Sequence, residues 1–271
     1  MDTTLPLVQI IILALIQGLT EFLPVSSSAH LILVPKFFQW SSQGLVMDVA
    51  VHVGTLGAIF VYFWRDIMKM LKNVPHFLQG NWDTSGSKEI LFLMTGTIPA
   101  IIFGFILSEI GVAKLHSLGI IGLTSIFYGL LLYGVDKKMP MQRILGEMTC
   151  KDAFKIGIAQ ALALIPGTSR SGACMTMSRY LGFTRLESAK FSFLLSIPAI
   201  IAAATLTSYK AIKENQVDVF ADAALGAAFS LIAGLMAIHF MMRWLKKFNF
   251  TPFVLYRVGL GTFLIILFML S

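Results

Sequence analysis

Two short stretches of the sequence place charged, hydroxyl-bearing and glycine residues between apolar neighbours. The first, residues 17–30, reads QGLTEFLPVSSSAH, and the second, residues 166–172, reads PGTSRSG. A carboxylate in an apolar segment that crosses a membrane costs roughly 2.5–3.5 kcal/mol on insertion scales, so packing alone rarely explains one. The first stretch contributes a negatively charged residue, Glu21, and the second a positively charged one, Arg170. We therefore interpret the two stretches as halves of one polar site.

Gln17 and Glu21 are four residues apart, so a helix places both side chains on one face. Their oxygens could share a hard cation, Mg²⁺ or Ca²⁺, with water and a substrate phosphate completing its coordination. The alternative is structural, with Gln17 hydrogen-bonded to a neighbouring helix and Glu21 in an ion pair. We favour the metal site for both residues.

Three consecutive serines and a histidine follow Pro24. The hydroxyls and backbone N–H groups of Ser26, Ser27 and Ser28 could bind phosphate oxygens, or they could only cap the helix that follows. His30 could act on a bound phosphate as general acid, general base or nucleophile. The alternative for His30 is a hydrogen-bonded core residue, and its place in a polar loop favours the functional role.

Arg170 stands between Ser169 and Ser171 and is followed by Gly172. A guanidinium binds phosphate in a bidentate way and stays charged. Glycine lets the backbone approach closely, and the N-terminus of the following helix adds a partial positive charge. We predict that these four residues bind phosphate. An ion pair between Arg170 and Glu21 is the structural alternative, and the two are compatible in an empty site.

Asp48 and His52 form another pair four residues apart, in an apolar segment. If that segment lines the site, they could orient His30 or a metal-bound water. Arg257 also lies in an apolar segment, and we interpret it as structural, with its side chain reaching the cytoplasmic interface. Cys174 is interpreted as a small packing residue.

These residue types suit phosphoryl transfer. A cation near Glu21 would neutralise phosphate oxygens, and Arg170 would stabilise the charge that develops in the transition state. We predict four catalytic residues: Glu21, Ser27, His30 and Arg170. The nucleophile stays open among Ser27, His30 and water. The main alternative is a transporter or flippase for a lipid phosphate, which would need the arginine and hydroxyls but no acid–base group or catalytic metal.

Composition places these residues in a membrane protein. Of 271 residues, 56% are hydrophobic and only 13% are charged, against about 25% charged in soluble proteins. The net charge of +7 is better explained by cytoplasmic loops than by nucleic-acid binding, because the basic residues do not gather on one amphipathic face. The two cysteines have no spacing typical of a disulfide framework.

The elements that must position the site are apolar helices, and we predict an all-α polytopic membrane protein. Residues 5–34 and 155–180 are apolar but are broken at Pro24 and at Pro166-Gly167, so we predict two re-entrant helical hairpins there. Six other runs are long and apolar enough to cross a membrane. The predicted spans are residues 46–64, 90–108, 118–135, 188–208, 221–242 and 251–270.

Lysine and arginine counts assign the two sides of the membrane. With the 65–89 connection on the cytoplasmic side, eleven basic residues lie in inner loops and three in outer loops, as the positive-inside rule favours. The inner ones are Arg65, Lys69, Lys72, Lys88, Lys137, Lys138, Arg143, Lys151, Arg243, Lys246 and Lys247, and the outer ones are Lys114, Lys210 and Lys213. Both termini then face outward, and the two hairpins enter from opposite sides.

Hairpins that enter from opposite sides predict an inverted-topology repeat. The run PVSS from Pro24 matches the run PGTS from Pro166 at an offset of 142 residues, and Gln17 and Gln160 lie one residue out of that register. We predict one integral membrane domain, residues 1–271, built from pseudo-repeats of about 1–140 and 141–271. In such folds the broken segments meet near the bilayer midplane and form the site.

The two motifs resemble those of the bacitracin-resistance family, the undecaprenyl-pyrophosphate phosphatases. The family's (Glu/Gln)-x-x-x-Glu motif matches residues 17–21, its Pro-Val-Ser-Ser-x-x-His run matches residues 24–30, and its Pro-Gly-x-Ser-Arg-Ser-Gly-x-Thr motif matches residues 166–172. The resemblance extends along the whole chain. One departure is Cys174, where the family has threonine, which removes a hydroxyl that could contact phosphate.

The resemblance implies hydrolysis of undecaprenyl pyrophosphate to undecaprenyl phosphate and inorganic phosphate, which recycles the lipid carrier for cell-wall synthesis and confers bacitracin resistance. It also implies a divalent cation (Mg²⁺ or Ca²⁺), an inverted-repeat fold and a place in the bacterial cytoplasmic (inner) membrane. The expected partners are the polyprenyl pyrophosphate substrate and membrane lipid, with no nucleic acid. A homodimer is left open.

Overall fold

The computed structural model describes residues 6–40, 44–110, 117–213 and 220–270. Within these ranges the regular structure is helical, apart from one isolated β-bridge between Arg143 and Phe183. The helices are α1 (Leu7–Phe22), α2 (Ser27–Phe38), α3 (Gly44–Tyr62), α4 (Trp64–Leu78), α5 (Ser85–Ile110), α6 (Leu118–Lys138), the 3-10 helix η2 (Leu145–Glu147), α7 (Cys150–Leu162), α8 (Arg170–Tyr180), α9 (Arg185–Lys213), α10 (Phe220–Trp244) and α11 (Thr251–Leu270).

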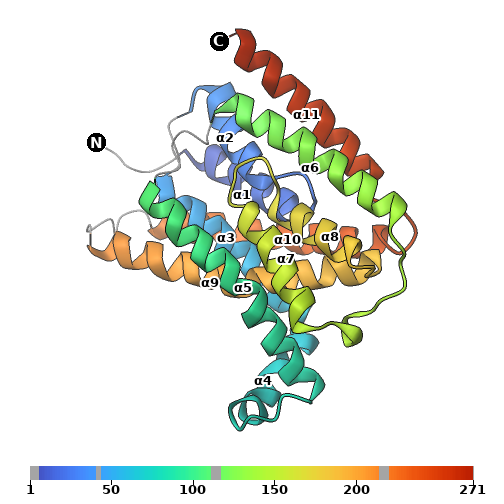
Figure 1. The fold of residues 1–271 in the computed structure, drawn as a ribbon. Coiled ribbons are helices and arrows are strands. Elements are labelled where there is room, and N and C mark those ends of the chain that lie inside the picture. The colour runs from blue at the N-terminus through green and yellow to red at the C-terminus, as the bar shows by residue number, and fades with distance from the viewer. Residues whose placement is uncertain (1–5, 41–43, 111–116, 214–219, 271) are drawn as a thin grey trace.

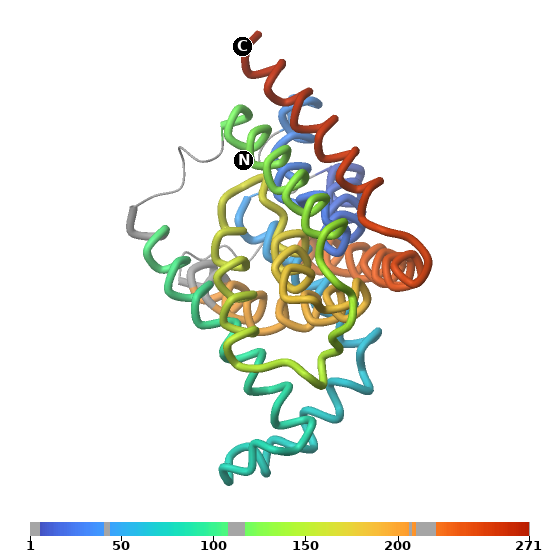
Figure 2. The backbone as a smooth tube through the Cα atoms, turned by 45° about the vertical axis from the view of Figure 1, so that its right-hand side comes forward, coloured from blue at the N-terminus to red at the C-terminus, as the bar shows by residue number. Residues whose placement is uncertain are grey.

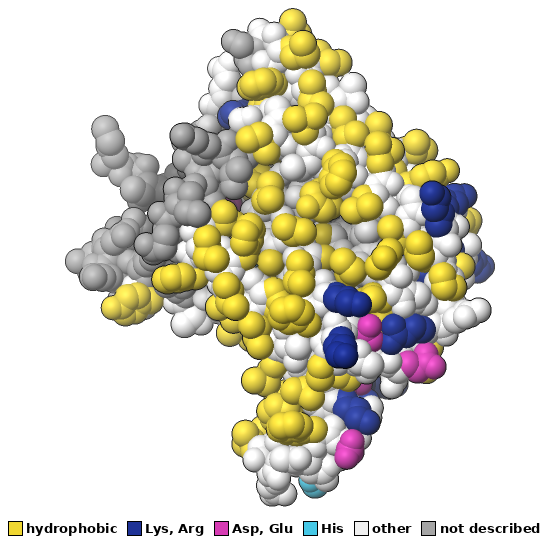
Figure 3. Space-filling model, in the orientation of Figure 1, with side chains coloured by type: hydrophobic (Ala, Val, Ile, Leu, Met, Phe, Trp, Pro, Cys, Tyr) yellow, Lys and Arg dark blue, Asp and Glu magenta, His cyan; other side chains and the backbone are white. Residues whose placement is uncertain are grey.

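Six helices of the described chain are long and apolar enough to cross a membrane: Gly44–Tyr62, Ser85–Leu107, Leu118–Lys138, Arg185–Thr205, Ala221–Trp244 and Thr251–Leu270. They confirm the six predicted spans, with boundaries that differ by a few residues. Apolar side chains cover much of the face drawn in Figure 3, and most Lys and Arg side chains of that face lie toward one side. The chain is therefore a multi-pass membrane protein.

The 65–89 connection contains a helix, α4, as well as loop. The exposed large apolar side chains of α4 form one stripe, because 100° per residue brings them within about 120° of one another. They are Trp64, Met68, Leu71, Val74 and Leu78. On another face, Lys69 Nζ lies 2.8 Å from Glu89 Oε1 of α5. An exposed apolar stripe beside a charged face is typical of a helix that lies in a membrane interface.

Two helix–break–helix units lie between the long helices. Residues 23–26 separate α1 from α2, and residues 163–169 separate α7 from α8. Pro24 and Pro166 each lack an N–H and disfavour helix in the preceding residue, so the two predicted breaks are confirmed. The four arms are 11 to 16 residues long, which is shorter than the roughly 20 residues needed to cross a bilayer.

Close helix contacts hold the two units in place. A Cβ atom added to Gly18 of α1 would lie 2.7 Å from Ser230 O of α10, and one added to Gly157 of α7 would overlap the backbone of α5. The helices α6 and α11 also cross at glycines, and Figures 1 and 2 both show them side by side along one edge of the molecule. Each broken unit is therefore packed against long helices.

Candidate active site

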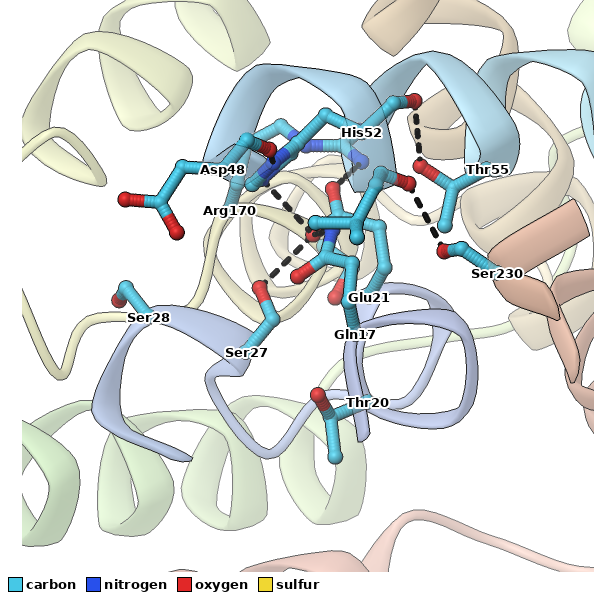
Figure 4. A network of polar contacts seen from close by, with 12 residues as sticks. Gln17, Thr20, Glu21, Ser27, Ser28, Asp48, His52, Thr55, Arg170 and Ser230 are labelled. Atoms are coloured by element: carbon cyan, nitrogen blue, oxygen red, sulfur yellow. Dashed lines mark hydrogen bonds and ion pairs between the residues drawn. The ribbon is translucent and has the colours of Figure 1, made fainter. Parts of the chain in front are cut away.

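Glu21 is the centre of the polar site and accepts hydrogen bonds from side chains of three helices (Figure 4). Gln17 Nε2 of α1 lies 3.0 Å from Glu21 Oε2, and Ser27 Oγ of α2 lies 2.7 Å from the same oxygen. Arg170 Nη2 of α8 lies 2.6 Å from Glu21 Oε1. Because only 6% of the Glu21 side chain is exposed, these contacts replace water around the carboxylate. The carboxylate of the first stretch and the guanidinium of the second, which were predicted to share one site, therefore meet here.

The α3 helix brings Asp48 and His52 to the same place. His52 Nε2 lies 3.8 Å from Glu21 Oε2, and His52 Nδ1 lies 2.6 Å from the carbonyl oxygen of Asp48. A carbonyl only accepts, so Nδ1 carries a hydrogen and Nε2 faces the carboxylate. The structure therefore places His52 beside Glu21.

The two breaks share an unusual backbone geometry. Ser26 and Ser169 have φ angles of 75° and 67°, in the left-handed region that non-glycine residues rarely adopt. Each serine hydroxyl lies beside that of the serine two residues later, at 3.2 Å in the first unit and 3.3 Å in the second. The residues that follow these serines, Ser27 and Arg170, both reach Glu21. The same turn thus directs one residue of each unit into the site.

Arg170 is held on a second side by α9, because its Nη1 donates to the carbonyl oxygen of Ser192 at 2.9 Å. This side chain is 17% exposed. A guanidinium that is fixed at two points and still reaches a cavity can present its remaining donors to an anion. The geometry is compatible with both alternatives that the sequence left open, an ion pair and a phosphate-binding residue.

A cavity of about 350 Å³ opens beside Glu21. Its polar lining gathers eight of the predicted residues: Glu21, Ser26, Ser27, Ser28, Asp48, His52, Ser169 and Arg170. Two predicted phosphate-binding residues are outside this lining, because Ser171 Oγ donates to Leu23 O at 3.1 Å and Gly172 N donates to Ser169 Oγ at 3.2 Å. Their hydrogen bonds stabilise the breaks themselves.

His30 also lies outside the cavity lining. Its Nδ1 is 2.7 Å from the carbonyl oxygen of Ser26, and its Nε2 is 2.6 Å from Tyr256 Oη of α11. The two rings are stacked, with centroids 5.7 Å apart. A catalytic role for His30 stays a prediction, and these contacts connect His30 to the first break.

The side chain of Arg257 does not lie where the sequence analysis predicted. The prediction that its side chain reaches the cytoplasmic interface is wrong, because Arg257 is fully buried and donates to the carbonyl oxygens of Gly167 and Thr168 at 3.0 and 2.9 Å. The available signal was an arginine well inside an apolar span, where a charge is costly unless it has partners.

Gln17 and Glu21 could hold a divalent cation. Gln17 Oε1 is buried with no hydrogen-bond partner among the described residues, and Asp48 lines the cavity with Glu21. Within the described chain, no three His, Cys, Asp or Glu side chains are grouped so that they could hold a metal ion. Mg²⁺ often takes one or two carboxylates and completes its shell with water and substrate phosphate. Glu21 and Asp48, which line the cavity, could contribute to such a shell, whereas Gln17 lies outside the lining.

Comparison with known proteins shows which family the chain resembles along its length. A family described as "Bacitracin resistance protein BacA" matches residues 10–263. A protein of Jannaschia sp. (strain CCS1) named undecaprenyl-diphosphatase is 44% identical over 257 residues, which cover 94% of this chain and 96% of that protein. Proteins of the same name from Dinoroseobacter shibae and Campylobacter curvus are 45% and 44% identical over 262 residues, which cover 96% and 97% of this chain and 98% and 99% of theirs.

Proposed function

The chain belongs to the bacitracin resistance protein BacA family, and we propose that its polar site hydrolyses undecaprenyl diphosphate to undecaprenyl phosphate and inorganic phosphate. One observation carries this assignment: the hydroxyl of Ser27 and the guanidinium of Arg170 meet on the buried carboxylate of Glu21. Hydrolysis needs a nucleophile, a general base beside it and a positively charged group that binds the phosphate. Transport of a lipid phosphate needs no general base. The released undecaprenyl phosphate would return to cell-wall synthesis.

The geometry favours Ser27 as the nucleophile. In the proposed reaction Ser27 Oγ attacks the terminal phosphorus and its proton passes to Glu21 Oε2, 2.7 Å away. The bond from that phosphorus to the bridging oxygen breaks, and undecaprenyl phosphate leaves with the oxygen. Water then attacks the phosphorylated serine, Glu21 returns the proton to Ser27 Oγ, and inorganic phosphate leaves. Because His30 lies outside the cavity lining, it is less well placed to attack.

Arg170 would bind the phosphate and stabilise charge on its oxygens. The guanidinium already lies at the cavity, paired with Glu21, and a bound phosphate would share its donors. A divalent cation held by Gln17 and Glu21 would supply charge neutralisation on the diphosphate. The lipid tail would lie against the apolar part of the lining, to which α3 and α9 contribute Leu45, Val49, Ala199, Ile200 and Ala203 and the second break contributes Ala163.

Phosphate release by the purified protein in detergent tests this function. With undecaprenyl diphosphate as substrate, we expect release that falls roughly 100-fold in EDTA and recovers with excess Mg²⁺ or Ca²⁺, because a catalytic cation contributes several kcal/mol of charge stabilisation. Release that EDTA does not change would remove the cation from the mechanism. A folded protein that binds the lipid without releasing phosphate would favour the lipid-phosphate transporter.

The fold supports the inverted repeat and the two re-entrant hairpins as proposals. The equivalent left-handed serines, Ser26 and Ser169, lie 143 positions apart, and this offset also brings Gln17 and Gln160 into register. The packing of the helices is also related between the two halves. The α1 helix of the first half packs on α10 of the second half, and α7 of the second half packs on α5 of the first half. Two units of this kind would bring their breaks together inside the membrane.

The native cysteines offer a test of the proposed orientation. Cys150 is exposed at the start of α7 and Cys174 is buried. Because the charge count places residue 150 on the cytoplasmic side, we expect a membrane-impermeant maleimide to label the protein in inside-out vesicles and to spare it in intact spheroplasts. The Cys150→Ser variant should stay unlabelled in both. Labelling of Cys150 from outside would invert the proposed topology and the placement of both termini on the outer side.

A further inference from the structure

We infer that two adjacent residues of α11, Tyr256 and Arg257, position the two breaks that form the polar site. The inference rests on the proposed function, because it concerns the alignment of Ser27 and Arg170 in that reaction. Neither Tyr256 nor Arg257 lines the cavity. Each acts through the backbone of a different break, so both are positioning residues.

Arg257 holds the second break. Its Nη2 donates to the carbonyl oxygens of Gly167 and Thr168, at 3.0 and 2.9 Å, and its Nε donates to Ser125 O of α6 at 3.1 Å. No carboxylate among the described residues pairs with this fully buried guanidinium. Burying a charge is costly unless hydrogen bonds compensate it. Here main-chain carbonyls satisfy Nε and Nη2, while Nη1 is buried with no hydrogen-bond partner among the described residues. Arg257 therefore fixes the backbone immediately before Ser169.

Tyr256 holds the first break through His30. The carbonyl oxygen of Ser26 can only accept, so the His30 ring donates to it from Nδ1 at 2.7 Å, and His30 Nε2 shares a second hydrogen bond with Tyr256 Oη, 2.6 Å away. The rings of His30 and Tyr256 are stacked with an interplanar angle of 7°, and this stacking supports the two hydrogen bonds. The contact runs from α11 to the carbonyl of the strained serine itself.

The strain at Ser26 and Ser169 explains why both breaks need such support. A non-glycine residue at positive φ costs about 1–3 kcal/mol and persists only when its surroundings over-determine it. The carbonyls that α11 holds belong to Ser26 in one break and to the two residues before Ser169 in the other. Without the contact from Tyr256 through His30, Ser27 is free to turn away from Glu21. Without the contacts of Arg257, Arg170 is free to do the same.

Activity of single and double variants tests the inference. Tyr256→Phe removes one hydroxyl from a half-exposed residue, and we expect kcat to fall about tenfold with KM unchanged, because small misplacements of reacting groups cost up to about 100-fold. Tyr133→Phe, on an exposed part of α6, should leave kcat unchanged. His30→Ala combined with Tyr256→Phe should lose no more than His30→Ala alone, since both changes break one chain of contacts. Tyr256→Phe combined with Arg257→Lys should show multiplied losses, since two breaks are affected.

The outcomes separate this inference from the proposed function. Absence of phosphate release by the unaltered protein would overturn the function. Release by the unaltered protein together with full kcat in a folded Tyr256→Phe variant would overturn only the role of α11. A thermal midpoint that falls while kcat per folded molecule stays unchanged would also overturn it, because Tyr256 would then be structural. If Arg257→Lys does not fold, the pair of changes at His30 and Tyr256 still decides the question.

Discussion

Replacing Glu21 by glutamine is expected to lower kcat for phosphate release by about 1000-fold, in the range that a general base typically contributes. The change keeps the size and planarity of the side chain, so Gln17 and Ser27 can still hydrogen-bond it. An amide cannot take the proton of Ser27, and it leaves the guanidinium of Arg170 without its counter-charge. The measurement is kcat with undecaprenyl diphosphate in detergent, with the folded fraction determined by thermal unfolding.

An acid far from the site provides the matched control for Glu21→Gln. The Asp83 side chain is 99% exposed in the connection between α4 and α5, and Asp83→Asn makes the same acid-to-amide change there. We expect Asp83→Asn to keep full activity. A Glu21→Gln protein that is folded and keeps a third or more of kcat would show that Glu21 is not the base, and the site assignment would then be wrong.

The sequence was informative where chemistry and hydropathy coincide. A carboxylate and an arginine in apolar surroundings are costly unless they have partners, so Glu21 and Arg170, with Ser27 in the first motif, could be predicted to share a site without coordinates. The six spans could be predicted because each apolar run is long enough to cross the hydrocarbon core of a bilayer. The i, i+4 spacing of Asp48 and His52 correctly gave two residues on one face, and the structure adds that both line the cavity and that His52 lies beside Glu21.

The sequence could not show which way His30 points. In a helix a spacing of three residues leaves Ser27 and His30 only about 60° apart, so both could have faced the phosphate. Ser27 is the first residue of α2 and reaches past the end of the helix to Glu21, whereas the His30 ring turns back to the carbonyl of Ser26. No local sequence pattern encodes this difference in side-chain direction.

Arg257 shows a second limit of sequence reasoning. An arginine in a span can reach the interface or can lie buried among main-chain carbonyls, and its place in the sequence is the same in both cases. Its partners belong to a loop 89 and 90 positions away. Only the packing of α11 against α6 brings that loop within reach.

Replacing Arg170 by lysine is expected to lower kcat/KM by about 100- to 1000-fold, the usual effect of removing a donor that stabilises transition-state charge. Lysine keeps the charge but loses the planar fork, which here holds Glu21 with Nη2 and the Ser192 carbonyl with Nη1 at once. Arg65→Lys, at an exposed position of α4, is the matched control and should keep full kcat/KM. An Arg170→Lys protein with unchanged kcat/KM would show that the guanidinium binds no phosphate.

Stability distinguishes this role from a purely structural ion pair. Removing one partner of a buried pair leaves an uncompensated charge and typically costs about 3–5 kcal/mol, whereas removing both costs far less. We therefore expect Glu21→Gln and Arg170→Met each to lower the thermal midpoint, and the double variant to recover much of that loss. If the pair were only structural, activity would recover with stability in the double variant. Because we assign the base to Glu21 and the phosphate contact to Arg170, we expect the double variant to be stable and inactive.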